Sequence, residues 1–516
     1  MGISLNRRKR QKVGALALVL VTALLAGCSG AGAKTEPQQD ASQADSPPGT
    51  SATAKKPEPA TLRILTELAS AWPVQKDWAV WRWVKEKTNI TMVQETQTGP
   101  ESMALAIASG DMPDLFSIFP GDAQKYGPQG AFLDLSKHLD KMPNVKAFLA
   151  SRPDVAQRMT SPDGEMFQLL NDGSGVSNQM VWFYRDDIFK QHNLQEPKTW
   201  DELYETAKKL KQLYPDSYPF VFRHGLGTMS TFAPSFGIYP SFHEDMNTGK
   251  MKYGATDPGF KTLIEYLYKF NKEGLIPPDW LSMDYKSWTQ FITTNKSFIT
   301  VQYIGQIETM NAELKNGAHL KFMPPPLGKG SKPYLPKGDI EVFGFGVSSK
   351  TKKLDAVLRF LDFAYSKEGK DILSWGKEGE TYTYENGKRK LLPQFKTPVD
   401  LRKEAGIMTA GTYGLFDYEA MMSLSNDNER YSYQEAEKYR FPIVEVLPPL
   451  KPEESMSISA LQDQIEKYYK TSVTKFILGE TPLSQWDAYV SELDKMGLQK
   501  LLGVYQTGLD RIKAKK

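Results

Sequence analysis

Residues 61–118 read TLRILTELASAWPVQKDWAVWRWVKEKTNITMVQETQTGPESMALAIASGDMPDLFSI and hold the clearest alternation of strand and helix patterns in the chain. Strands are predicted at 61–66, 90–95 and 113–118, with helices between them at 77–88 and 101–109. Strands and helices that alternate at such short intervals are typical of a mainly parallel sheet covered by helices. The stretch therefore predicts an α/β fold.

Later segments continue the same alternation. Thr199 is a good helix N-cap, and two acidic residues follow it in the first turn of a helix predicted at 200–214. Apolar residues at helical spacing predict two more helices, over 354–365 and 461–477. No internal sequence repeat accompanies these patterns.

The first residues have the pattern of a secretory signal peptide. Four basic residues at 7–10 precede the apolar run Val13–Leu25, which is too short to span a bilayer comfortably. The sequence Leu-Ala-Gly-Cys at 25–28 then resembles the cleavage site of bacterial lipoprotein precursors, in which Cys28 receives a diacylglycerol. We expect a signal peptide at 1–27 and a lipid anchor at Cys28. The alternative is an uncleaved signal anchor that happens to end in a cysteine.

Composition separates a spacer from a folded region. Residues 28–60 are almost wholly small, polar, charged or proline, so they predict a disordered tether. Residues 61–516 are more than one hydrophobic core normally supports, which predicts two lobes. Cys28 is the only cysteine, so no disulfide is expected. The net charge of +3 is spread along the chain and offers no basic stripe for nucleic acid.

Several short motifs occur in an order that resembles the extracellular solute-binding proteins, the maltose-binding-like receptors of ABC importers. They are Gly110-Asp-Met-Pro-Asp114, Phe183-Tyr-Arg-Asp-Asp-Ile-Phe189, Pro197-Lys-Thr-Trp-Asp-Glu-Leu203, Ile299–Gly305, Phe360–Gly369, Trp375–Tyr382 and Lys475–Gly479. The later motifs resemble the large lipoprotein branch related to binders of oligosaccharides and alginate.

This resemblance implies a type II periplasmic-binding-protein fold with two lobes of parallel-rich sheet, flanking helices and crossing hinge strands. The implied first lobe is about 61–170 and 342–378, and the implied second lobe is about 180–322 and 379–516. The implied function is capture of a carbohydrate, an oligosaccharide in this branch, by closure of the hinge. The bound sugar would pass to ABC permease subunits, on the outer face of the membrane.

Sugar binding needs flat aromatic rings against the C–H faces of the sugar and polar groups for its hydroxyls. The resemblance places candidates in loops after strands: Trp72, Phe119, Asp122, Arg223, His224, Tyr303, Gln306 and Trp375. Asp417 and Tyr418 are further candidates. Arg223 would also suit the carboxylate of a uronic sugar. Each has a structural alternative, such as an ordinary turn acid for Asp122 or a helix-end plug for Trp375. Five other tryptophans are expected in cores: Trp182, Trp200, Trp280, Trp288 and Trp486.

Two other functions remain open. A polysaccharide-degrading enzyme would need a pair of carboxylates across the sugar, but no acidic residue lies in a recognisable catalytic motif. A sensor that reports ligand to a membrane kinase would share the same fold. Residues 213–219 are too short and too poor in oxygen ligands for a calcium loop. We expect no catalysis, no metal or other cofactor, and a monomer.

Overall fold

The computed structural model describes residues 57–66, 73–97, 101–172, 179–245, 247–329, 332–337, 343–396, 398–407, 413–442 and 447–514. They belong to the folded unit that begins at residue 56. The predicted signal peptide, most of the tether, the lipidation site Cys28 and the candidate Trp72 lie outside these residues. What the sequence indicates for them stays a prediction.

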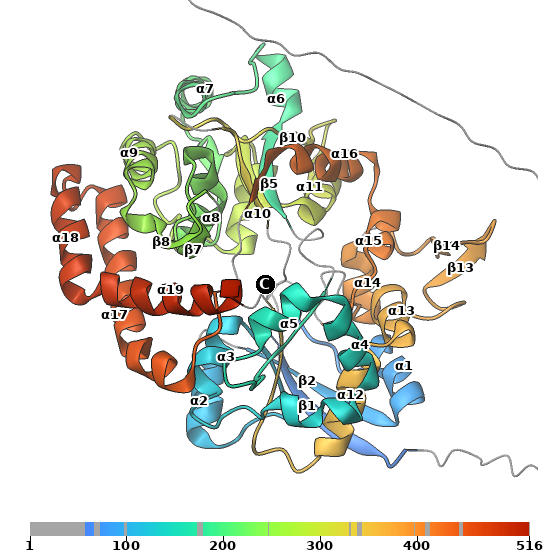
Figure 1. Ribbon diagram of the computed structural model, residues 1–516. Coiled ribbons are helices and arrows are strands. Elements are labelled where there is room, and N and C mark those ends of the chain that lie inside the picture. The colour runs from blue at the N-terminus through green and yellow to red at the C-terminus, as the bar shows by residue number, and fades with distance from the viewer. Residues whose placement is uncertain are drawn as a thin grey trace, which may run out of the picture. The chain divides into compact units, whose positions relative to one another are not determined.

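The first sheet has five strands in the order β2-β1-β3-β12-β4. The strands are β1 (Ala60–Thr66), β2 (Ile90–Thr96), β3 (Leu115–Ile118), β4 (Leu169–Leu170) and β12 (Gly344–Val347). Helices cover both faces (Figure 1): α1 (Ala79–Thr88), α4 (Pro143–Ser151) and α12 (Leu354–Ala364) on one, α2 (Ser102–Ser109) and α3 (Pro120–Tyr126) on the other. Side chains along β1 point alternately to the two faces of the sheet, so both faces are apolar and need covering. Leu62 and Ile64 pack against one layer of helices, and Leu65 packs against the other.

The second sheet has four strands in the order β10-β5-β9-β6. They are β5 (Met180–Arg185), β6 (Phe220–Val221), β9 (Ile299–Tyr303) and β10 (Leu320–Met323). The core around this sheet, which we call the second core, holds the five tryptophans expected to pack internally, each at most 3% exposed. The first core is the one around the first sheet.

The helices expected from sequence are present within a few residues. Thr199 caps α7 (Trp200–Leu213) as predicted, because its hydroxyl accepts a hydrogen bond of 3.1 Å from the Glu202 amide. The predicted C-terminal helix lies within α17 (Pro452–Leu478). The remaining helices are α5 (Pro153–Met159), α6 (Asp186–Gln191), α8 (Met229–Phe232), α9 (Pro258–Lys272), α10 (Tyr285–Thr293), α11 (Ile307–Glu313), α13 (Lys367–Trp375), α14 (Pro398–Ala405), α15 (Tyr418–Leu424), α16 (Asp427–Ala436), α18 (Trp486–Met496) and α19 (Leu498–Ala514).

The two sheets are mixed rather than parallel-rich, which corrects one detail of the expected fold. Of the seven strand pairings described in them, three are parallel: β1 with β2, β1 with β3, and β6 with β9. In the first sheet β12 runs antiparallel to both of its neighbours, β3 and β4. In the second sheet β5 runs antiparallel to both of its neighbours. Three short two-stranded pairs complete the strands: β7 (Phe242–Asp245) with β8 (Lys250–Tyr253), β11 (Leu335–Lys337) with β15 (Arg440–Pro442), and β13 (Tyr382–Glu385) with β14 (Lys388–Leu391).

The first core also includes residues that were expected in the second lobe. Leu401, Ile407 and Tyr413 belong to it, although the implied second lobe takes up the chain again at 379. The Tyr413 ring lies 4.8 Å from that of Trp81 on α1, edge to face, and the Trp78 indole donates to the Lys403 carbonyl at 3.0 Å. These apolar and hydrogen-bonded contacts hold Lys403 and Tyr413 against α1 and the residue that precedes it.

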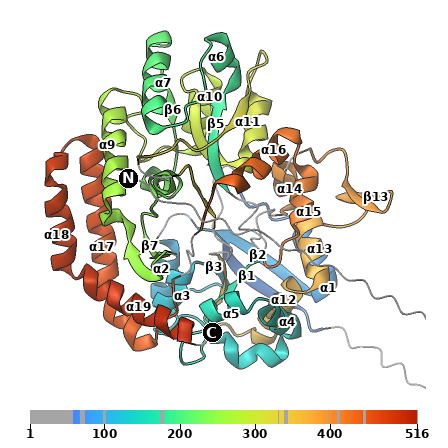
Figure 2. The same ribbon diagram turned by 45° about the horizontal axis from the view of Figure 1, so that its top comes forward.

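The C-terminal helices connect the two cores. Figure 2 shows α17 beside α9, with α18 on the other side of α17, and α17 packs on α9 of the second core. The other end of α17 contacts α3: the Ser455 hydroxyl donates to the Gln124 carbonyl at 2.6 Å, and Lys125 forms an ion pair of 2.9 Å with Asp463. Among the described residues no helix is both long enough and apolar enough to cross a membrane.

Candidate functional site

The second sheet brings four of the candidate residues to one edge. Strands β6 and β9 are adjacent and parallel, so their carboxyl ends meet at the same side. Arg223 and His224 follow β6, while Tyr303 ends β9 and Gln306 lies one turn further. The His224 and Tyr303 rings are 6.0 Å apart and meet edge to face. The resemblance implied that each of these positions follows a strand, and the structure brings the four to one edge of the second sheet.

A buried glutamine that was not among the candidates joins this group. Gln302 is fully buried, and its Oε1 accepts hydrogen bonds from Arg223 Nη2 at 3.3 Å and from the Tyr303 amide at 3.0 Å. Within the described residues, Gln302 Nε2 and Arg223 Nε have no hydrogen-bond partner. Two buried donors are thus unsatisfied at this edge. A polar side chain within the apolar strand Ile299–Tyr303 was the signal that could have identified Gln302.

Two aromatic residues of α10 hold the arginine in place. The Arg223 guanidinium carbon lies 5.4 Å from the centroid of the Tyr285 ring and 5.9 Å from that of Trp288. The Tyr285 hydroxyl donates to Gln306 Oε1 at 3.1 Å, so Gln306 is bonded to the same aromatic residue that contacts Arg223. Burial lowers the pKa of Arg223. Cation–π contact offsets part of this desolvation and orients the guanidinium.

The loop after β6 turns sharply to place the imidazole. His224 has a left-handed φ of 75° and is followed by Gly225, which has a φ of 51°. A Cβ on Gly225 would lie 2.7 Å from the Leu281 carbonyl oxygen, so this position requires glycine. Desolvation by the surrounding protein, and secondly the Arg223 charge, lower the pKa of His224 to about 4. The imidazole is therefore neutral at physiological pH and has one donor and one acceptor nitrogen.

An NMR titration of the histidine rings checks this assignment. In the wild-type protein His224 is expected to titrate near pH 4, and the variant Arg223→Gln is expected to raise the pKa of His224 toward its ordinary value of 6.5. Since unfolded His224 takes up its proton at higher pH than folded His224, its contribution to stability is complete above about pH 6.5 and declines toward pH 4. A wild-type midpoint near 6.5 would contradict the assignment.

The first core contributes Phe119, an exposed ring. Phe119 follows β3, is 45% exposed and meets Phe343 edge to face at 5.5 Å. Asp122 has a different task, because its Oδ2 accepts a hydrogen bond of 3.0 Å from the Phe119 amide and caps α3. Burial raises the pKa of Asp122. The structure supports the structural alternative for Asp122 and leaves Phe119 as an open aromatic surface.

Trp375 is not available for stacking. It is 4% exposed, and its indole nitrogen donates to Asp417 Oδ2 at 2.8 Å. The Arg389 guanidinium lies 5.4 Å from its centroid, and the Tyr382 ring is 6.0 Å away. These contacts cover the ring, so the expected role in the site is contradicted and Trp375 closes the end of α13 instead. Asp417 is likewise engaged by this contact.

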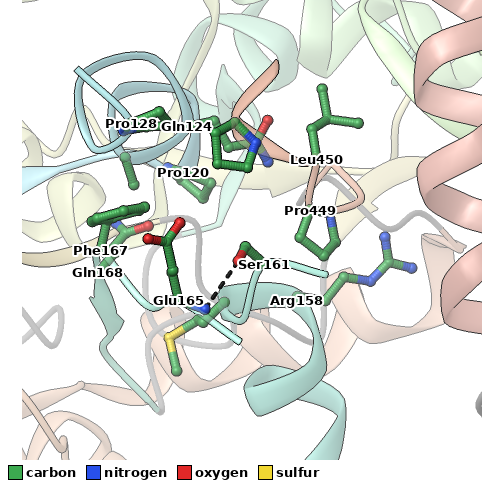
Figure 3. A pocket seen from close by; sticks show the side chains of 13 residues that line it. Pro120, Gln124, Pro128, Arg158, Ser161, Glu165, Phe167, Gln168, Pro449 and Leu450 are labelled. Atoms are coloured by element: carbon green, nitrogen blue, oxygen red, sulfur yellow. Dashed lines mark hydrogen bonds between the residues drawn. The ribbon is translucent and has the colours of Figure 1, made fainter. Parts of the chain in front are cut away.

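A small cavity beside α3 is not a sugar site. It lies between Pro120, Gln124 and Phe167 on one side and Pro449 and Leu450 on the other (Figure 3). Its volume is about 40 Å³, whereas ligand pockets usually measure about 300–1,000 Å³. The cavity has room for only a few water molecules. It marks the seam between α3 and the segment that leads into α17.

Comparison with known proteins identifies related chains. The family model described as bacterial extracellular solute-binding protein matches residues 65–371, more than half of the chain. The fructooligosaccharide ABC transporter substrate-binding protein FusA of Streptococcus pneumoniae serotype 4 is 23% identical over 457 residues, which cover 81% of this chain and 83% of FusA. The polygalacturonan/rhamnogalacturonan-binding protein YtcQ of Bacillus subtilis is 23% identical over 430 residues, covering 79% of this chain and 82% of YtcQ.

Solved structures agree with the architecture described above. The alginate-binding protein AlgQ2 without calcium ion superposes with a TM-score of 0.76 at 24% identity, covering 88% of this chain and 98% of AlgQ2. The complex of FusA with kestose gives a TM-score of 0.72 at 21% identity, covering 88% of this chain and all of that chain. At these identities the likeness shows the fold, and it confirms the expected periplasmic-binding-protein fold.

Proposed function

Because the chain belongs to the bacterial extracellular solute-binding proteins, we propose that it captures an oligosaccharide and delivers it to the permease of an ABC transporter. The single observation that carries the sugar assignment is the group at the ends of β6 and β9. There an exposed imidazole and a half-buried tyrosine ring lie beside buried polar donors.

The chemistry of this group fits a carbohydrate. The Tyr303 ring offers a flat apolar surface for the C–H face of a sugar. Neutral His224 both donates and accepts hydrogen bonds, as sugar hydroxyls do. The unsatisfied Arg223 Nε and Gln302 Nε2 need acceptors, and hydroxyl oxygens reached directly or through water would supply them. FusA and YtcQ, two relatives named for carbohydrate ligands, support the same ligand class.

Capture works by closure of one core on the other. A ligand held at Tyr303 and His224 would gain a second wall from exposed Phe119 of the first core, a contact that an open form lacks. Such a differential contact stabilises the closed form and signals occupancy to the permease. No step of this process changes a covalent bond of the sugar, so the protein acts as a carrier rather than as an enzyme.

The location follows from the sequence pattern. We place the folded unit outside the cell, held at the membrane by acyl chains on Cys28 and separated from it by residues 29–60. Two or more acyl chains give stable attachment, whereas one gives only marginal binding. The permease subunits and the carbohydrate are the partners of this proposal, and the carrier works as a monomer.

A thermal-shift screen of residues 56–516 tests the ligand class. Neutral probes are kestose and nystose, and uronic probes are oligogalacturonides, with amino acids and peptides as controls. At about 100 times Kd, a ligand adds about 2.7 kcal/mol to the free energy of unfolding, so we expect the melting temperature to rise by several degrees. Small-angle scattering should show a smaller radius of gyration with the same sugar. A melting temperature raised only by amino acids or peptides would refute the sugar assignment.

A further inference from the structure

A second pocket adjoins the loop that carries His224. Its volume is about 410 Å³, about ten times that of the cavity beside α3. Leu226, Gly227 and Ser230 form one wall, immediately after His224 in the sequence. The β7–β8 pair forms the second wall, and α17 forms the third. This volume falls within the range usual for small-molecule sites.

The pocket combines aromatic rings with polar groups. Tyr253 stacks on Phe242 with 4.4 Å between centroids, and Tyr469 of α17 meets Tyr253 edge to face at 6.4 Å. Within the described residues, no hydrogen bond joins the hydroxyl of Tyr253 or of Tyr469 to the protein. Two tyrosines of the pocket wall therefore have hydroxyls that are free to bond a ligand.

The charges of the pocket cancel locally. Glu466 and Lys470 are one turn apart on α17 and form an ion pair of 2.5 Å. A wall whose two charged groups already pair with each other gives no net attraction to a carboxylate or an ammonium group. Aromatic rings, free hydroxyls and charges that are already paired favour an uncharged, hydroxyl-rich ring over an ionic ligand.

We infer that this pocket receives an uncharged sugar residue of a longer oligosaccharide, whose other part lies against His224 and Tyr303. This inference rests on the proposed function and extends it to chain length. One loop supplies both surfaces, since His224 faces Tyr303 while Leu226, Gly227 and Ser230 line the pocket. A single oligosaccharide that follows this loop would occupy both sites, so affinity would grow with its length.

Isothermal titration with sugars of increasing length tests the inference. The probes are sucrose, kestose, nystose and longer fructooligosaccharides. The matching series of oligogalacturonides is the ionic comparison, and affinity that grows with its length would contradict an uncharged residue in this pocket. Tyr469→Ala should weaken binding of the longest bound member about tenfold and of the shortest less than twofold. Tyr468→Ala is the matched control, because Tyr468 is the preceding residue of α17 but stacks on Tyr489 outside the pocket. It should change neither affinity.

A second variant guards against a folding defect, since Tyr469 also contacts Phe260. Ser230→Trp fills the pocket from the side of α8 and should produce the same loss for long sugars only. Equal affinity of wild type and both variants for every length would overturn the inference while leaving the proposed function intact. An equal loss at all lengths would also overturn it. If the wild type bound no member of either series, the proposed function would fail with it.

Discussion

Replacement of Tyr303 by alanine is expected to weaken oligosaccharide binding about thirtyfold. The ring is half-buried at the end of β9 and supplies the aromatic surface of the site. Loss of its contact with one sugar face removes about 2 kcal/mol of binding free energy, which corresponds to this factor in Kd. The measurement is isothermal titration with the sugar that gives the largest thermal shift. The free energy of unfolding should change little, because the hydrogen bond from the backbone amide of residue 303 to the side-chain oxygen of Gln302 remains.

Two controls make this expectation specific. Tyr303→Phe keeps the ring and should retain affinity within a few fold, which separates stacking from the hydroxyl. Tyr384→Ala removes an equally large ring that is 49% exposed on the β13–β14 pair, and it should not alter Kd. Unchanged affinity in Tyr303→Ala would show that the sugar lies elsewhere. The candidate site would then be wrong even if the family assignment holds.

Replacement of Arg185 by methionine is expected to destabilise the folded unit by about 3 kcal/mol. Arg185 is 2% exposed and forms two bonds to Asp187, of 2.7 and 2.8 Å. Its Nη1 also donates to Asn295 Oδ1 at 2.7 Å and to the Ile292 carbonyl at 3.1 Å. Methionine fills a similar space but leaves the Asp187 carboxylate, the buried Ile292 carbonyl and the exposed Asn295 side chain without this donor.

Urea denaturation followed by fluorescence measures this change. The matched control is Arg430→Met, because Arg430 is 45% exposed and its ion pair of 3.5 Å with Asp427 lies at the surface. Exposed pairs contribute about 0–1 kcal/mol, so the control should unfold close to the wild-type midpoint. A loss for Arg185→Met no larger than that of Arg430→Met would contradict the role assigned to this cluster.

Local patterns predicted the fold well because short-range physics sets them. The alternation at 61–66 became β1, and the cap at Thr199 began α7 as expected. The direction of a strand could not be predicted in this way, because the sequence of β12 does not show that the strand runs antiparallel to β3. The motif around Arg185 carried the family resemblance, yet its arginine is a buried structural residue.

The site residues show where local sequence patterns stop being informative. Arg223, His224, Tyr303 and Gln306 come together because β6 and β9 are neighbours, a long-range pairing that local patterns do not show. Both roles stayed open for Trp375, because its covering partners, Asp417 and Arg389, come later in the sequence. The sequence around a tryptophan does not show which distant residues will cover its ring. Local sequence indicates which side chains follow a strand, but long-range packing decides which of them remain open.

The 27-residue helix α17 has a consequence for the motion of the protein. Its N-terminal half is bonded to α3 through Ser455 and Asp463, and the helix also packs on α9. Any opening that separates α3 from α17 must break the exposed Lys125–Asp463 ion pair, whose strength falls as ionic strength rises. The resting angle between the two halves, and with it the rate at which cargo enters, should therefore respond to the salinity of the surroundings.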